Sequence, residues 1–230
     1  MRGLAIAASL LLTTVGSWAA DSAQERLDKS ARVLSEIMSA PDKGIPQDLL
    51  NKADCVIVLP DVKKAAFVVG GEYGRGFAEC RKQSGSGWAA PAAMRFEGGS
   101  VGFQIGGESA DIVMLVMNRH GMDKLLGDKI TLGADASIAA GPVGRAATAN
   151  TDVKMTAEIL AYSRAKGLFG GISLNGASLR PDTKENAQLY GRDMTTRDIV
   201  MGNVTPPASA HALTAELDRY SSGANADRAK

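Results

Sequence analysis

The segment 65–78 most constrains the fold, because it alternates apolar residues with period two while glycines interrupt it. The apolar positions of one parity are Phe67, Val69, Tyr73 and Phe77. Such alternation predicts a β-strand with one buried face. Interior strand glycines usually mark bulges or sharp curvature, and here they stand at Gly70, Gly71, Gly74 and Gly76. We therefore expect a strand that coils around a compact barrel or a sandwich corner. Arg75 shares the apolar parity, so either a bulge turns it outward or it lines an interior site.

Hydrophobic period predicts the remaining elements. A short apolar strand over 56–59 should stop at Pro60 and Asp61, and later strands are expected at 88–96, 101–107, 112–117, 130–138, 153–162 and 167–174. The last two form a hairpin with the loop 163–166. Helical spacing predicts helices at 22–40, 184–190, 196–202 and 208–220, and a helical turn at 122–126. The expected fold class is α+β: a β-rich antiparallel sandwich or partly closed barrel with helices packed on its faces.

Residues 1–19 have the organisation of a signal peptide. Arg2 supplies positive charge, residues 4–15 are apolar and uncharged, and Ser17 and Ala19 place small residues where signal peptidase reads them. The apolar run is shorter than the ~20 residues that a membrane-spanning helix needs. We expect cleavage after Ala19 and a periplasmic or secreted mature protein.

Two cysteines, Cys55 and Cys80, remain after that cleavage. An exported protein meets an oxidising compartment, which permits a disulfide. The alternative is a pair of small buried thiols that never meet. Because both residues lie where strands are expected to begin or end, the disulfide is favoured.

The charge of the mature chain is balanced. Removing residues 1–19 takes away Arg2, one of 26 basic residues, and none of the 25 acidic residues, so the formal net charge becomes zero. General nucleic-acid binding needs a basic field over a whole face, so this class of function is not expected. A local basic patch remains compatible with the balance.

The sequence motifs that suggest catalysis or metal binding lack the neighbouring structure or ligand spacing that these functions need. Gly98–Gly102 matches the G-x-S-x-G pattern of a hydrolase nucleophile elbow, but that motif needs a following helix, and alternation predicts a strand instead. Ser100 is therefore interpreted as a turn residue. His120 and His211 lack partners at zinc-ligand spacing, and no acidic run resembles a calcium loop. We assign no catalytic residue, no metal and no cofactor.

Two stretches place cations among small residues: Gly141-Pro142-Val143-Gly144-Arg145 and, in the predicted hairpin, Tyr162 to Gly171. Arg145 follows a turn, and Arg164 and Lys166 lie in the hairpin loop, where cations project into solvent and can meet phosphate. Phe169, next to Leu168, either inserts into a bilayer or belongs to the hairpin's core face. The turn after Pro60 and a later basic pair extend this patch with Lys63, Lys64, Arg81 and Lys82.

These stretches resemble the SYLF family. The resemblance extends upstream through Val58-Leu59-Pro60, 70–76, Gly87-Trp88, 102–106 and 132–135, in the family's order. Eukaryotic members bind phosphoinositide membranes, and fungal members bind actin. The resemblance implies one lipid-binding domain over 20–230, with a core at about 25–191 and a C-terminal helical extension at 195–222.

The function expected from these observations is non-enzymatic. It is a periplasmic lipid-binding domain that recognises anionic phospholipid surfaces through the basic patch and associates peripherally with the membrane. The alternative is a structural or interaction protein of the cell envelope that binds another protein or the wall. Actin is not an expected partner, because the periplasm does not contain it.

Overall fold

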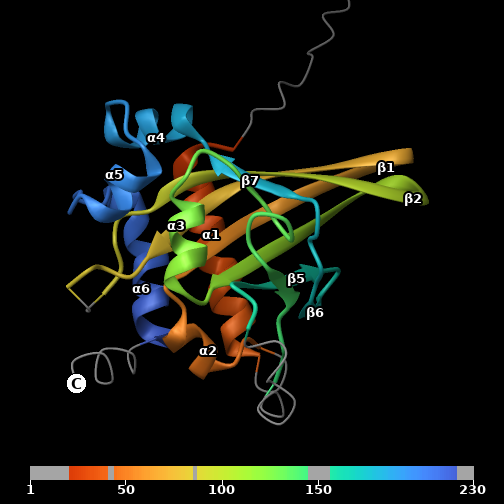
Figure 1. Ribbon diagram of the computed structural model, residues 1–230, viewed down its shortest axis with the longest axis horizontal. Coiled ribbons are helices and arrows are strands. Elements are labelled where there is room, and N and C mark those ends of the chain that lie inside the picture. Colours follow the sequence, from red (N-terminus) through yellow and green to blue (C-terminus); the bar gives the residue numbers. More distant parts are fainter. Residues whose placement is uncertain (1–20, 41–43, 85–86, 145–155, 222–230) are drawn as a thin grey trace, which may run out of the picture.

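The computed structural model describes residues 21–40, 44–84, 87–144 and 156–221, with only the backbone described at 65–69 and 100–107. The helices are α1 (Ala23–Ser39), α2 (Gln47–Lys52), α3 (Arg119–Leu125), α4 (Thr183–Tyr190), α5 (Thr196–Met201) and α6 (His211–Tyr220). The strands are β1 (Cys55–Cys80), β2 (Ala92–Val116), β3 (Ile130–Thr131), β4 (Ile138–Ala140), β5 (Ile159–Ala165), β6 (Leu168–Gly171) and β7 (Ser178–Pro181). Figure 1 shows their arrangement.

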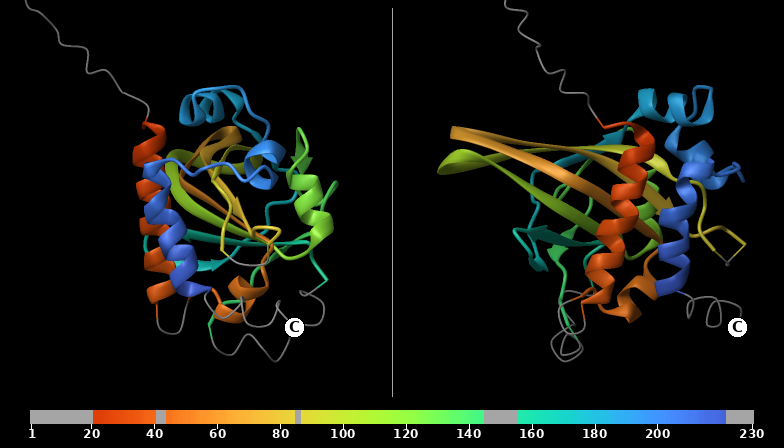
Figure 2. Two further views of the ribbon diagram at one scale, coloured as in Figure 1. Left: turned by 90° about the vertical axis from the view of Figure 1, so that its left-hand side faces the viewer. Right: turned by 180° about the vertical axis from the view of Figure 1, so that it is seen from behind.

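The strands form one strongly curled sheet around which the helices pack. Its order is β3-β7-β2-β5-β4, with β1 paired along β2 and β6 beside β5. All pairs are antiparallel except β4 and β5, which run parallel. The curled sheet makes a half-barrel with helices on its faces (Figure 2). The predicted α+β class and the partly closed barrel are confirmed.

The prediction that a strand ends at Pro60 is wrong. β1 continues through it, and a register shift between Leu59 and Val62 takes up Pro60 and Asp61 as a bulge. Proline has no N–H to give to the ladder, so a bulge accommodates it without ending the strand. Asp61 has the left-handed φ of 52° there. In the same way, β2 is one strand where three had been expected.

β1 doubles back on itself, so that the Cα atoms of its first and last residues, Cys55 and Cys80, lie 3.9 Å apart. Cys55 and Cys80 form a disulfide with an S–S distance of 2.03 Å, which confirms the predicted pairing. A Cβ on Gly76 would lie 2.0 Å from the Val58 carbonyl oxygen, so the two legs of β1 cross at a distance that only glycine allows. The predicted link between an interior glycine and curvature is confirmed at Gly76.

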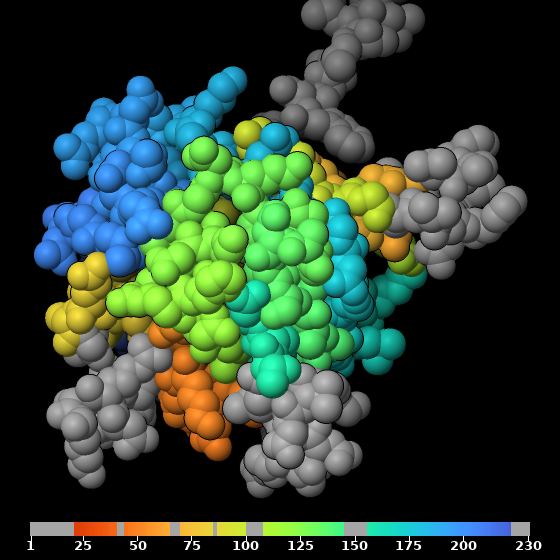
Figure 3. Space-filling view, in the orientation of Figure 1, coloured from red at the N-terminus to blue at the C-terminus, as the bar shows by residue number. Residues whose placement is uncertain are grey.

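The turning ribbon extends away from the helices. We call residues 62–73 of β1 together with residues 97–110 of β2 the β arm. In Figure 1 the ribbons of β1 and β2 extend to the right, away from the helices. Figure 3 shows one side of the molecule, on which α3 and the segment after it (green) cover the sheet. The described helices include none long and apolar enough to cross a membrane.

Successive side chains of a strand point to opposite faces of the sheet, and both faces of this sheet are buried. In β1, Val56 and Val58 belong to the cluster covered by α1 and α6, whereas Ile57 and Leu59 belong to the cluster covered by α3 and α5. Figure 2 shows α1 and α6 side by side on one face and α3 on the other. α1 therefore packs against the sheet, as expected for a fold with helices packed on its faces.

α1 begins and ends where its sequence indicates. The Ser22 side chain accepts from the Glu25 backbone N–H, and the Glu25 carboxylate accepts from Ser22, which forms a capping box. Its apolar side, including Leu27, Leu34 and Ile37, is buried against the sheet and α6. The short helix α2 was not predicted.

Candidate binding site

The hairpin that carries the predicted cations is tighter than expected. β5 extends to Ala165 and β6 begins at Leu168, which leaves a two-residue turn at Lys166 and Gly167. Both turn residues have positive φ, 50° and 77°, as the type I′ turns of tight hairpins require. Arg164 therefore lies in β5, opposite Phe169, and not in the loop.

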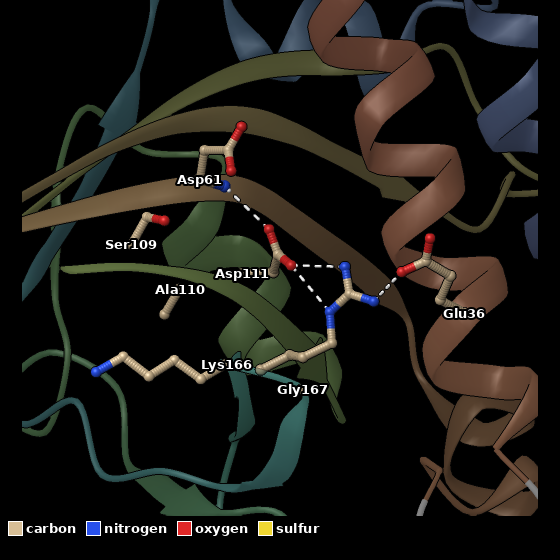
Figure 4. Close-up of a pocket in the computed structure, with 8 residues that line it drawn as sticks. Glu36, Asp61, Ser109, Ala110, Asp111, Lys166 and Gly167 are labelled. Atoms are coloured by element: carbon tan, nitrogen blue, oxygen red, sulfur yellow. Dashed lines mark hydrogen bonds and ion pairs between the residues drawn. The ribbon is translucent and has the colours of Figure 1, made fainter.

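Arg164 is held by two carboxylates. Its Nε and Nη2 donate to Asp111 Oδ2 at 2.9 and 2.7 Å, and its Nη1 contacts Glu36 of α1. The other oxygen of Asp111 accepts from the Asp61 backbone N–H at 3.0 Å. Figure 4 shows this chain of contacts from the β1 bulge to α1. One guanidinium thus joins α1, β5 and the bulge, and the expected solvent-projecting cation is a structural one.

A polar groove of about 340 Å³ surrounds this network. It is lined by Glu36, Asp61, Ser109, Ala110, Asp111, Arg164, Lys166 and Gly167. Three of these residues are acids and two are cations, and two of the acids, Glu36 and Asp111, pair with Arg164. An anion entering the groove would meet carboxylates, so the groove itself is not suited to phosphate. No group of three or more metal-ligating side chains occurs within the described ranges.

The turn exposes a cation and an apolar side chain together. The side chain of Lys166 is 77% exposed and donates to Glu108 of the β arm at 2.6 Å. This contact lowers the pKa of the Glu108 carboxyl and raises that of the Lys166 ammonium. Ion pairs in full contact with water hold weakly, so Lys166 remains reachable. Leu168, two residues on, is 76% exposed.

Phe169 lies on the core side of the hairpin. Its ring stacks on the buried Tyr162 with centroids 5.6 Å apart and planes at 6°. Gly141 lies against the same tyrosine, because a Cβ on it would come within 2.1 Å of Tyr162 Cζ. The glycine that opens the Gly-Pro-Val-Gly motif therefore lets backbone lie flat on a ring. Arg145, at the end of that motif, falls outside the described residues, as does the predicted signal peptide.

Lys63 and Lys64 lie in β1, not in a turn. Lys63 is exposed, and Lys64 forms an ion pair with Glu72 at 3.2 Å. Lys64 is the register partner of Glu108, which also binds Lys166. The fold therefore brings Lys64 of the β arm and Lys166 of the hairpin turn close to one acid, Glu108. Lys63 precedes Lys64 in the strand, so its side chain points to the opposite face.

Arg81 does not extend the predicted patch. It is only 6% exposed, and its guanidinium lies 4.0 Å from the centroid of the Trp88 ring. Stacking of this kind holds the cation in the interior. Lys82, the next residue, is exposed.

The hydrolase pattern is embedded in a strand. Ser100 lies within β2, in register with Gly70 of β1, so the interpretation of Ser100 as a turn residue is wrong. No helix follows it at the place where a nucleophile elbow requires one. His120 lies on α3 and contacts Glu158, and His211 begins α6.

Comparison with known proteins decides the family. Residues 97–220 match the Ysc84 family, described as "Las17-binding protein actin regulator". The chain belongs to this family. It is the SYLF family, so the predicted resemblance is confirmed.

The curated relatives are longer than this SYLF chain. It is 34% identical to "SH3 domain-containing YSC84-like protein 1" of Bos taurus over 198 residues, which cover 84% of the chain and 58% of the relative. The protein of the same name from Homo sapiens is 33% identical over 198 residues, 84% of the chain and 57% of the relative. "LAS seventeen-binding protein 3" of Saccharomyces cerevisiae (strain ATCC 204508 / S288c) is 31% identical over 206 residues, 86% of the chain and 44% of the relative. The family description and the name of the yeast relative are those of binding proteins, which supports a non-enzymatic binding domain.

The partners of Arg164 were missed in the sequence of this SYLF domain. In the sequence Asp111 is one of several scattered acids, and Glu36 lies on the polar side of the predicted helix 22–40. Both make ion pairs with Arg164. Asp111 lies on β2 opposite the bulge of β1. The register of these two strands must be known before this position identifies Asp111 as a partner of Arg164.

Proposed function

We propose that this SYLF domain is a non-enzymatic, periplasmic or secreted lipid-binding domain that docks peripherally on anionic phospholipid surfaces. The observation that carries the proposal is the pair of exposed side chains at the β5–β6 turn, Lys166 and Leu168. A cation beside an apolar side chain is the combination that an interface between headgroups and acyl chains accommodates. Lys64 of the β arm adds charge beside the turn, near the same Glu108, and Lys63 adds charge on the other face of that strand.

The contributions can be ranked by magnitude. A cation near an anionic surface contributes about 1 kcal/mol, and full burial of a leucine side chain contributes about 1.5–3 kcal/mol. Three lysines and one leucine are therefore comparable. Arg164 takes no direct part in this proposal, because Asp111 and Glu36 occupy its guanidinium. Arg145 remains a predicted member of the basic set.

The proposed location, in the periplasm or outside the cell, rests on the sequence of residues 1–19. Cleavage after Ala19 would release residues 20–230 into the periplasm or the medium, where they would meet the outward leaflet of a membrane. The disulfide between Cys55 and Cys80 supports an oxidising compartment.

The charged part of the surface is tested by replacing Lys63, Lys64 and Lys166 with glutamine. We expect the mature protein to bind vesicles of phosphatidylglycerol or cardiolipin, to ignore phosphatidylcholine, and to bind less tightly as salt is raised. The triple variant should lose affinity up to about a hundredfold on the ~1 kcal/mol-per-cation scale. Flotation with vesicles measures this loss.

The matched control removes three lysines elsewhere. Lys124, Lys129 and Lys184 are exposed and lie on α3, after it and on α4. Their replacement by glutamine changes the net charge equally and should leave vesicle binding within about twofold. Equal losses in the two triple variants would reduce the interaction to overall charge and count against a defined surface.

The apolar part is tested by two neighbouring substitutions. Leu168→Ser should abolish the salt-resistant fraction of vesicle binding and leave the melting temperature unchanged, because the side chain is exposed. Phe169→Ala should instead lower stability by about 2–4 kcal/mol, because the ring stacks on Tyr162 and contacts the core. Retained salt-resistant binding in the Leu168 variant would contradict insertion at the turn.

Binding to a protein partner is the alternative function, and the name of the yeast relative, "LAS seventeen-binding protein 3", favours it. For this chain the corresponding partner would be an envelope protein or the wall. Failure of the mature protein to float with any anionic vesicle, while it remains folded, would replace the lipid proposal by this one.

A further inference from the structure

Three arginines stand side by side across the sheet. In the strand registers Arg75 of β1 pairs with Arg95 of β2, and Arg95 pairs with Arg180 of β7. Directly opposed residues on adjacent strands share one face, with Cβ atoms roughly 4.5–5.5 Å apart. Like charges in this arrangement repel, so a row of three needs compensation. We call Arg75, Arg95 and Arg180 the arginine row.

The two outer members of the row have carboxylate partners. Arg75 Nη2 lies 2.5 Å from Asp182 Oδ2 and 2.6 Å from Glu185 Oε2. Arg180 contacts Glu97. Glu185 is shared, because Arg26 of α1 binds its other oxygen. These acids therefore form ion pairs with the two outer arginines of the row and with Arg26 of α1.

The central arginine is left without a close partner. The nearest carboxylate oxygen to Arg95, Asp182 Oδ2, lies 3.9 Å from its Nε. The Nε atoms of Arg95 and Arg180 are buried and have no hydrogen-bond partner within the part of the chain that the structure describes. Buried donors of this kind cost free energy unless something accepts from them. The side chain of Arg95 is nevertheless 34% exposed, so solutes can reach the middle of the row.

The row lies where the helix cover of one face ends. Arg75 and Arg95 have the parity of Phe77 and Ala93, which are buried in the cluster under α1 and α6. Beyond the row on the same parity comes Tyr73, 47% exposed. The arginine row is thus the border between a helix-covered core and an open strip of sheet.

We propose that the arginine row is a binding site for a phosphate group. Four cations, Arg26 and the row itself, stand against three carboxylates, Glu97, Asp182 and Glu185, and the excess positive charge falls on Arg95. Guanidinium forks match the oxygens of a phosphate, and a tetrahedral dianion can accept from neighbouring forks at once. Such an anion would offset the repulsion along the row. The site shares no residue with the lipid-docking turn.

The test uses the mature protein and inorganic phosphate, with pyrophosphate as a second probe. We expect saturable binding by calorimetry, weakened at least tenfold in Arg95→Gln and partly retained in Arg95→Lys. The matched control is Arg197→Gln, an exposed arginine on α5, which should bind as the wild type does. Arg95→Gln should melt no lower than the wild type, since it removes a like charge from the row.

The source of the phosphate group is separated by vesicles of equal charge. Preference for phosphatidic acid over phosphatidylglycerol that is lost in Arg95→Gln assigns the site to a lipid phosphomonoester. Binding of free phosphate without that preference assigns it to a soluble ligand. The Lys63, Lys64 and Lys166 variant should keep phosphate binding, which separates this site from the docking surface. Absence of binding to every probe, or equal binding by wild type and Arg95→Gln, overturns the assignment.

Discussion

Glu79→Gln should raise the free energy of unfolding by about 3 kcal/mol at pH 7. Burial raises the pKa of the Glu79 carboxyl to about 8, against 4.5 for the free side chain. At pH 7 the unfolded chain has lost this proton and the folded chain keeps it, so folding must take up a proton over about 2.5 pH units at ~1.36 kcal/mol each. Glutamine is uncharged at every pH and removes this cost.

The surroundings of Glu79 fit the neutral acid. The side chain is fully buried on β1, and its oxygens lie 3.1 and 3.3 Å from Thr214 Oγ1 of α6. The same hydroxyl lies 3.2 Å from the Ala210 carbonyl oxygen. A hydroxyl has one proton. A protonated Glu79 carboxyl donates to the Thr214 hydroxyl, and that hydroxyl donates to the Ala210 carbonyl oxygen. Each of the two protons in this hydrogen-bond series then has an acceptor.

The sign of the pH dependence follows from the raised pKa. Stability from this group is complete below about pH 4.5 and is lost as pH rises through about 8. Urea unfolding at pH 5, 7 and 8.5 measures it: wild type should weaken across this range more steeply than Glu79→Gln. Asp123→Asn, at an exposed acid on α3, is the control and should follow wild type. Parallel slopes for wild type and Glu79→Gln would show that Glu79 is ionised in the fold.

Removal of the disulfide should cost about 3–4 kcal/mol. The estimate follows from the 25-residue separation of Cys55 and Cys80 in the chain-entropy description of cross-links. Cys55→Ala, Cys80→Ala and the double variant should lose nearly the same amount, because each breaks the same bond. Unfolding of wild type under reducing conditions should give a matching loss. A loss below about 1 kcal/mol in the double variant would mean that strand pairing alone holds the ends of β1 together.

Local sequence patterns were sufficient for several parts of the fold. The period of 22–40 predicts a helix on a face of the sheet, and the interior glycines predict curvature, which Gly76 supplies by its approach to Val58. The cysteine pairing was predicted because both residues stood at strand ends. These features depend on residues close in sequence or on one residue type.

The predictions that are wrong concern features that depend on strand register. Pro60 reads as a strand end in the sequence, because the bulge there is set by the pairing of Leu59 with Ile112 and Val62 with Ala110, which the sequence of β1 alone does not reveal. Arg164 was expected in solvent because its acids come from α1 and β2. The arginine row becomes visible only when β1, β2 and β7 are aligned. Long-range pairing, which no local period encodes, determines each of these contacts.

The closed course of β1 also determines how the protein transmits force. Tension applied between the two ends of the chain reaches Cys55 and passes directly to Cys80 through the covalent bridge. The β arm segment between them lies off the load path, and about 85 Å of extended chain, at ~3.4 Å per residue over 25 residues, stays hidden from the pull. The β1 strand of the ribbon is therefore mechanically sheltered: the helices and outer strands can be peeled away while it remains a covalent loop.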